Sequence, residues 1–146
     1  MTKHTYTPKD VEKLVGITTA SLREQRTRFI PYTFGKQNKD NGRWTYTSVD
    51  MVAMACIPII EPYVRSQYEA AAAAYAIKND ISKIIGICDG EYRDFLIITE
   101  RGNFVTNDRS RFNVMHGGPV LVISVPWVAN HMPQKLVARL KADLVE

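Results

Sequence analysis

The apolar positions near the start of the chain follow a helical spacing. They recur three or four residues apart, at Val11, Leu14 and Val15. Thr7 can accept a hydrogen bond from a free N–H group at a helix start, and Pro8 suits the first helical position. Gly16 then favours the left-handed residue that ends many helices. This pattern predicts a first helix from Pro8 to Val15.

A second and more polar helix is predicted directly after that turn. It runs from about Thr19 to Arg28, and Thr18 or Thr19 is expected to cap it. Leu22 should be its inward-facing anchor, with Phe29 closing its end. The outward positions carry hydroxyl and guanidinium groups, which can bond to phosphates and base edges.

The next segment alternates in the manner of a hairpin. Two stretches have strand composition, Tyr32–Phe34 and Arg43–Thr47, and residues 36–42 between them supply the turn. Asn41-Gly42 is a strong signal for a local reversal. Alternation places Trp44 and Tyr46 on one face of the second strand. Ser48 is then expected to cap a further helix that reaches about Ile57.

Small side chains dominate the middle of the chain. Pro58 and Pro62 bracket a break, after which a helix is predicted over 63–78. It contains the run Ala70–Ala74, the best helix-forming residue type, which permits close approach by another helix. Two partners remain open: another helix of the same domain, or the same helix in a second copy of the chain. We favour the second copy.

After residue 81 the period becomes that of strands. Predicted strands lie at Lys83–Cys88, Phe95–Thr99, Phe104–Thr106 and Pro119–Val125, with a polar loop over Asn107–Gly118 and a final helix over Pro133–Leu144. The fold class is therefore expected to be α+β. Residues 1–60 form one predicted domain. Residues 61–146 form a second, made of a connecting helix, a small antiparallel sheet and a C-terminal helix.

Positive charge is concentrated in the first third of the chain. Residues 1–50 carry nine Lys and Arg against five Asp and Glu, an excess of +4 that equals the net charge of all 146 residues. The remainder therefore sums to zero. An uneven solvated surface would explain this distribution, and so would a binding site for a polyanion such as DNA.

A set of residues recurs in a recognisable order at the front of the chain: Gly16, Leu22-Arg23, Gly42-Arg43, Tyr46-Thr47 and Asp50. With this order, the first 57 residues or so resemble the winged helix-turn-helix DNA-binding domain of MerR-type regulators, and they are also similar to phage excisionases and repressors. The resemblance implies that the second helix enters the major groove, while Arg43 and Tyr46 hold phosphates beside the wing.

These observations predict a sequence-specific transcriptional regulator of bacterial or phage origin, and repression is preferred to activation. It would bind an inverted repeat in double-stranded DNA as a homodimer. The candidate DNA-binding residues are Thr18, Thr19, Ser21, Arg23, Arg26, Arg28, Lys36, Lys39, Arg43 and Tyr46. Two alternatives remain: an excisionase-like factor that bends DNA, and a protein-interaction module on a winged-helix scaffold.

Enzymatic and metal chemistry find little support in the sequence. The fragment His116–Pro119 is superficially similar to an esterase oxyanion loop, but no Gly-x-Ser-x-Gly motif accompanies it. The three histidines and two cysteines have no ligand-like spacing. We expect no enzyme activity and no cofactor. A soluble, cytoplasmic and nucleoid-associated protein is expected, because no apolar run is long enough to span a bilayer.

Aromatic residues of the second half could line a pocket or belong to a core. They are Phe95, Phe104, Phe112 and Trp127. For this half we place self-association first, a protein partner second and a small ligand third.

Overall fold

The structure is a computed structural model that describes residues 5–79, 95–99, 102–106 and 121–145. The first half contains β1 (Thr5–Tyr6), α1 (Pro8–Val15), α2 (Thr19–Arg28), β2 (Lys36–Gln37), β3 (Trp44–Thr47), α3 (Ser48–Ile60), a 3₁₀ turn (Glu61–Tyr63) and α4 (Gln67–Lys78). The second half contains β4 (Phe95–Thr99), β5 (Gly102–Thr106), β6 (Leu121–Ser124), α6 (Val125–Asn130) and α7 (Gln134–Val145). The predicted α+β class, with a small antiparallel sheet and a C-terminal helix, is confirmed.

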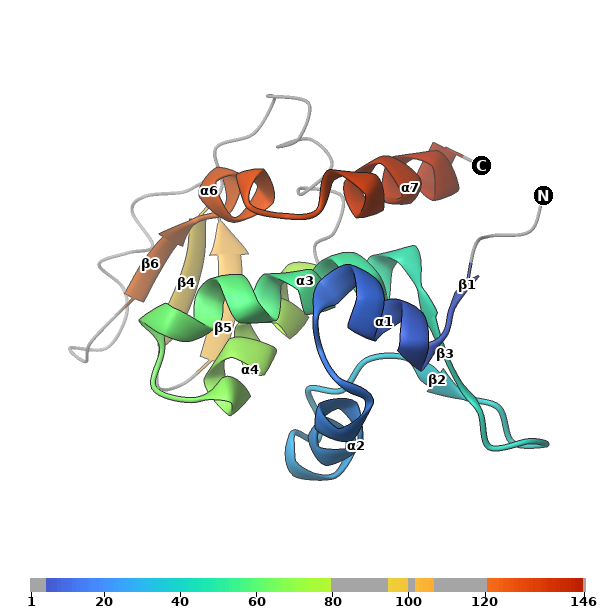
Figure 1. Cartoon of the computed structure of the whole chain (residues 1–146). Coiled ribbons are helices and arrows are strands. Elements are labelled where there is room, and N and C mark those ends of the chain that lie inside the picture. Colours follow the sequence, from blue (N-terminus) through green and yellow to red (C-terminus); the bar gives the residue numbers. More distant parts are fainter. Residues whose placement is uncertain (1–4, 80–94, 100–101, 107–120, 146) are drawn as a thin grey trace.

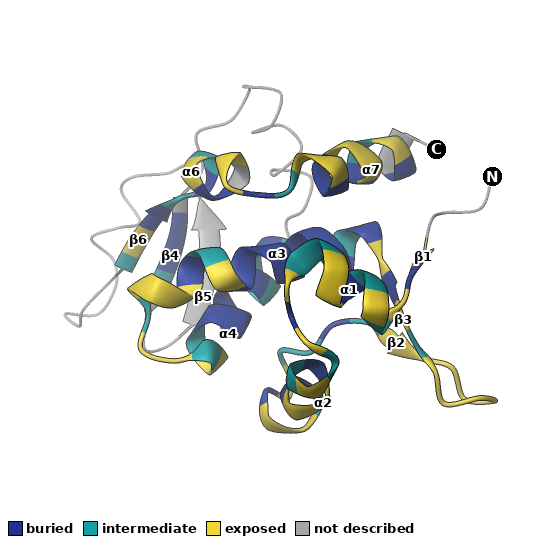
Figure 2. Cartoon of the chain, viewed as in Figure 1, coloured by how far each residue is buried: buried dark blue, intermediate teal, exposed yellow. Residues whose placement is uncertain are grey.

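The central element is α3, which runs through the middle of the molecule (Figure 1). All residues from Met51 to Ile57 are buried, and so is Ile60. An apolar helix this completely covered requires neighbours on every side. Helices α6 and α7 lie along one side of it, and α2 and α4 lie along the other (Figures 1 and 2).

Two small antiparallel sheets flank this helix. In the first the strand order is β1-β3-β2, so that the hairpin strands β2 and β3 are joined by a strand from the start of the chain. Tyr6 pairs with Tyr46 in its register. In the second sheet the order is β5-β4-β6. The predicted pairing of Phe95–Thr99 with the strand that includes residues 104–106 is confirmed.

The helix ends at the front of the chain follow local rules. Thr7 and Asp10 form a capping box at α1, where the Asp10 N–H donates to the Thr7 hydroxyl and the Thr7 N–H donates to the Asp10 carboxylate. Gly16 ends α1 with a φ of 87°. Thr18 caps α2 by accepting a hydrogen bond from the Ser21 N–H. These local predictions are confirmed.

Four predicted elements have wrong boundaries. Residues 32–34 do not form a strand, because the Phe34 side chain is buried and the Tyr32 ring packs edge-on against Tyr68 and Tyr75 of α4. Helix α3 is capped by Thr47 rather than Ser48, and it continues through Pro58, whose ring is exposed, to the buried Ile60.

The third of these elements is the connecting helix. It begins at Gln67 instead of Tyr63, because Ser66 caps it by accepting from the Glu69 N–H. The strand predicted over Pro119–Val125 ends at Ser124, since Val125 already begins α6.

The alanine run was assigned to the wrong partner. Residues Ala70–Ala74 are buried within the single chain, where α4 packs against α3 and against β4 and β5 of the second sheet. Small side chains allow this close approach, as predicted, but α3 of the same chain uses it. The alanine face is therefore not available to a second copy.

A polar cluster ties the last helix to the front of the molecule. The Ser48 hydroxyl donates to the carboxylate of Asp143 in α7, and both residues are buried. The Tyr6 hydroxyl is hydrogen-bonded to Ser48, and Arg139 pairs with Asp143 at 3.4 Å. This cluster holds α7 against β1 and the start of α3.

Several predictions fall on residues outside the described ranges. They concern the strand at 83–88, the loop at 107–118, the fragment His116–Pro119 and Cys88. Among the residues that the structure describes, no helix combines the length and apolar character that crossing a bilayer requires. The division into domains at residue 60 stays a prediction.

Candidate nucleic-acid interface

The outer side of α2 is polar and open to solvent. Leu22 and Gln25 are its only buried residues, whereas Arg23, Glu24, Thr27 and Arg28 are exposed. Arg28 forms an ion pair with Glu24 one turn earlier, and both side chains remain largely in water. Such a pair is weak and can be exchanged for another anion. Arg23 has no acidic partner among the ion pairs that the described residues make.

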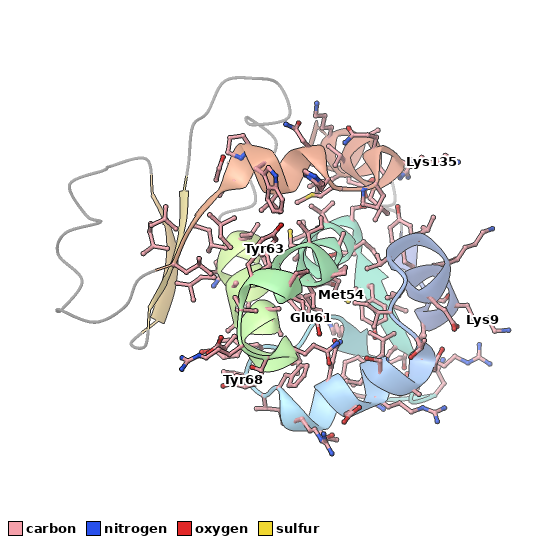
Figure 3. All side chains as sticks on the ribbon, turned by 60° about the vertical axis from the view of Figure 1, so that its left-hand side comes forward. Lys9, Met54, Glu61, Tyr63, Tyr68 and Lys135 are labelled. Carbon is pink, nitrogen blue, oxygen red and sulfur yellow. The ribbon has the colours of Figure 1, made fainter. Side chains whose placement is uncertain are left out.

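The hairpin tip adds basic side chains to the same side of the molecule. Lys36, Lys39 and Arg43 are all exposed, and α2 and the hairpin tip project away from α6 and α7 (Figure 1). We call Arg23, Arg28, Lys36, Lys39 and Arg43 together the basic face. In Figure 3, α2 lies along the lower edge of the molecule, and the helix that bears Lys135 lies along the upper edge.

The tip is shaped by its own polar side chains. The Asp40 N–H donates to the Asn38 side-chain oxygen at 2.8 Å, and the Arg43 N–H donates to the Asn41 oxygen at 3.0 Å. Gly42 has a φ of 69°, in the left-handed region. These contacts define the backbone of the tip and leave the side chains of Lys39 and Arg43 free to extend into solvent.

The hydroxyl residues at the start of α2 are divided in role. Thr18 is exposed, but its hydroxyl oxygen already caps the helix. Thr19 and Ser21 are partly exposed at the same helix end. A helix N-terminus carries free N–H groups and positive partial charge, which favour a nearby phosphate.

Arg26 is engaged within the protein. Its guanidinium donates to the Tyr46 hydroxyl at 2.6 Å and lies 4.2 Å above the centre of the Trp44 ring. A guanidinium stacked on an aromatic ring and bonded to a phenol is strongly positioned. Arg26 therefore links α2 to strand β3, and the structure does not place it free on the surface with Arg23.

Tyr46 lies inside the protein. Only 1% of it is exposed, and its hydroxyl accepts the bond from Arg26. The loop backbone also comes close, because a Cβ atom built on Gly35 would stand 2.5 Å from the Tyr46 ring. The phosphate contact that the resemblance implied for Tyr46 is not available in this arrangement. Its ring supports the base of the hairpin instead.

Sequence reasoning missed three residues of this site. Trp44 was assigned a strand face but not a partner, and Gly35 and the buried Gln25 were not singled out. The contact between Arg26 and Tyr46 joins residues 20 positions apart. The sequence signals that point to this contact are Gly35 itself and the two aromatic residues, Trp44 and Tyr46, on one face of β3.

A different surface lies on the second half. An open groove of about 360 Å³ is lined by Tyr63, Trp127 and residues 121–124. The rings of Tyr63 and Trp127 meet edge to face at 5.5 Å, and Tyr63 is 57% exposed. Of the aromatic residues considered for a pocket, Trp127 is partly exposed and Phe112 lies outside the described residues. Phe95 and Phe104 lie in β4 and β5, and only the backbone is described at these two residues.

The described ranges contain no cluster that could bind a metal ion. Groups of three or more His, Cys, Asp or Glu side chains that could hold a metal do not occur there. Cys56 is fully buried in α3, and burial raises the pKa of its thiol far above the usual value, which keeps it protonated.

Comparison with known proteins gives no relative from which a function could be taken. No protein-family model matches the chain, and no curated protein matches it. The resemblance to MerR-type domains therefore stays a prediction based on a few residues.

Proposed function

We propose that the protein binds double-stranded DNA in a sequence-specific manner, with α2 in the major groove and the hairpin tip against the adjacent backbone. The observation that carries this proposal is the basic face, whose five cationic side chains are exposed on two projecting elements of one side. A projecting polar helix beside a basic hairpin matches the dimensions of a groove and its flanking phosphates.

The proposed roles follow from where each side chain stands. Lys36, Lys39, Arg43 and Arg28 contact phosphates and supply affinity that depends on salt. Base readout falls to Thr19, Ser21 and Arg23, which lie on the outer part of α2 or at its start.

Arg26 and Tyr46 have an indirect role in this proposal. They position α2 relative to β3, because the guanidinium is already bonded to the phenol and stacked on Trp44. Their loss should alter the angle between helix and hairpin, and so reduce affinity without removing a phosphate contact.

The proposal extends to a transcriptional repressor that acts as a homodimer on an inverted repeat. One helix in one groove reads only a short half-site, and two-fold pairing doubles the sequence that is read. The alanine face of α4 is excluded as the dimer contact, because it is buried against α3. Repression requires only that the bound protein block access to a promoter.

The decisive experiment is selection of bound sequences from a random pool of duplex DNA at two salt concentrations. We expect an enriched motif with two-fold symmetry, and a smaller bound fraction at the higher salt. The Arg23→Ala variant should enrich a degenerate version of the motif, because it loses a base contact. Failure to enrich any motif from the wild-type pool would overturn sequence-specific binding, and enrichment of an asymmetric site would overturn the dimer.

A further inference from the structure

A small cavity lies directly behind α2. Its walls are formed by Leu22, Gln25 and Arg26 of the helix, by the loop at 33–34, and by Tyr46 and Met54. In Figure 3 the Met54 label marks the centre of the molecule, with α2 along the lower edge. The cavity has a volume of about 10 Å³. That is room for about one water molecule.

Two hydrogen-bond donors in the residues lining this cavity have no partner among the residues that the structure describes. They are the side-chain nitrogen Nε2 of Gln25 and Nε of Arg26, and both atoms are buried. Gln25 as a whole is only 5% exposed. Buried polar atoms in proteins are almost always hydrogen-bonded to protein or to ordered water, since an unmet donor is costly.

We propose that this cavity is a binding site for a single ordered water molecule, which accepts hydrogen bonds from Gln25 and Arg26. A buried water needs two to four polar partners. The two orphaned donors provide two, and the hydroxyl groups of Thr33 and Tyr46, residues that also line the cavity, can accept the hydrogens of the water.

The dimensions and the lining favour water over other small occupants. Chloride, bromide and oxyanions are larger than water, and the space holds about one water only. An apolar occupant would leave both donors unmet. A single water molecule therefore accounts for both observations. It bonds to the two donors that lack a partner, and it fits the small volume of the cavity.

The site has a consequence for the position of Arg26. Its guanidinium is bonded to Tyr46 through Nη2 and stacked on Trp44. A water on Nε adds a third restraint and connects the guanidinium to Gln25 in the preceding position of α2. Gln25 is thus a positioning residue for the contact between α2 and β3, whether or not the protein binds DNA.

The test is a high-resolution crystal structure of the wild-type full chain, with a parallel structure of Gln25→Met. The wild type should show one density peak within about 3.2 Å of both Gln25 Nε2 and Arg26 Nε. The Met variant conserves the length of the side chain and removes the donor, so the peak should weaken or disappear. Gln37→Met is the matched control, because Gln37 is exposed at the hairpin and its amide bonds to Gly42.

Solution measurements keep the proposal testable if the Met variant does not fold. In NMR spectra of the wild type, the side-chain amide protons of Gln25 should show a nuclear Overhauser effect to water. Its sign should be the one expected for a water molecule that stays bound and tumbles with the protein. A cavity without density in the wild-type crystals, or a Gln25 amide without this signal, would overturn the proposal. So would an anomalous peak at the site in crystals soaked in bromide, which would identify an anion instead.

Discussion

Helices α2 and α4 both looked like contact helices from their composition, yet they meet different surroundings. In α2 two of ten residues are buried, whereas in α4 the run Ala70–Ala74 and Ile77 are all buried. Long cationic side chains keep α2 at the surface because burying an unpaired charge is costly. The methyl side chains let α4 approach α3 so closely that no partner from outside can reach the run Ala70–Ala74. Composition thus identifies a contact face but does not say whose contact it is.

One of the two largest effects is expected where this comparison is most direct. Ala71→Leu adds bulk to a residue with no exposed surface, so it should lower the free energy of unfolding by about 2–3 kcal/mol through overpacking against neighbouring helices. Ala20→Leu makes the same change on the exposed part of α2 and should cost less than about 0.5 kcal/mol. Urea unfolding of both variants measures the difference. Equal losses would mean that the two helices are not packed as described.

Substitutions at the base of the hairpin should lower stability as much as those in α4, and more than those on the outer side of α2. Gly35→Ala places a methyl group against the Tyr46 ring at a φ of +85° and should cost about 3 kcal/mol. Gly16→Ala has nearly the same φ, +87°, with no atom within 4 Å of the new methyl. It should cost only the backbone strain, about 1–2 kcal/mol. Thermal melting of the pair isolates the steric part, and identical melting temperatures would contradict the close contact with Tyr46.

An ion pair joins the C-terminal end of α4 to the first turn of α3. Lys78 Nζ lies 2.8 Å from Oδ1 of the buried Asp50, whose other oxygen belongs to the capping box of α3. Lys78→Met should cost about 1–2 kcal/mol, because Asp50 loses a charged partner while buried. Arg65→Met breaks the far more exposed pair with Glu69 and should cost less than about 0.5 kcal/mol. If Arg65→Met lost more stability than Lys78→Met in chemical denaturation, the ion pair between Lys78 and Asp50 would not stabilise the fold as described.

The smallest effect concerns pH. Burial raises the pKa of the Tyr6 hydroxyl above its usual 10.0, and the nearby Asp143 carboxylate raises it further, while the bond to Ser48 opposes them. A raised pKa in the folded state means that this contribution to stability is complete below pH 10 and is lost as the pH rises above it. Tyr6→Phe should therefore flatten the fall in unfolding free energy between about pH 9 and pH 11. A variant that follows the wild-type curve throughout would show that Tyr6 does not titrate differently on folding.

What the sequence predicted well depends on neighbours a few residues apart. The cap at Thr7, the left-handed Gly16, the buried Leu22 and the outward Arg23 all follow from spacing and backbone preference. The α+β class followed from the change of period after residue 81. Of the predicted site, Arg23, Arg28, Lys36, Lys39 and Arg43 are exposed as DNA contacts must be.

What it missed depends on contacts between distant segments. No local rule shows that Arg26 meets Trp44 and Tyr46, or that Tyr46 is buried beneath them. Residues 32–34 have strand composition, but the packing of their aromatic rings on α4 outweighs that preference. The alanine run illustrates the same limit, since its partner α3 is set by the tertiary fold.

The salt dependence of duplex binding tests the central claim most directly. Affinity for the selected duplex is measured across a series of salt concentrations for the wild type, Arg43→Ala and Lys135→Ala. Lys135 is exposed on α7, at the edge of the molecule opposite α2. Its replacement by Ala removes one positive charge, as the replacement of Arg43 does. We expect Arg43→Ala to lower the slope of log affinity against log salt by about 0.9, and Lys135→Ala to leave it unchanged. Equal slopes for all three proteins, or no duplex binding by the wild type, would contradict this claim.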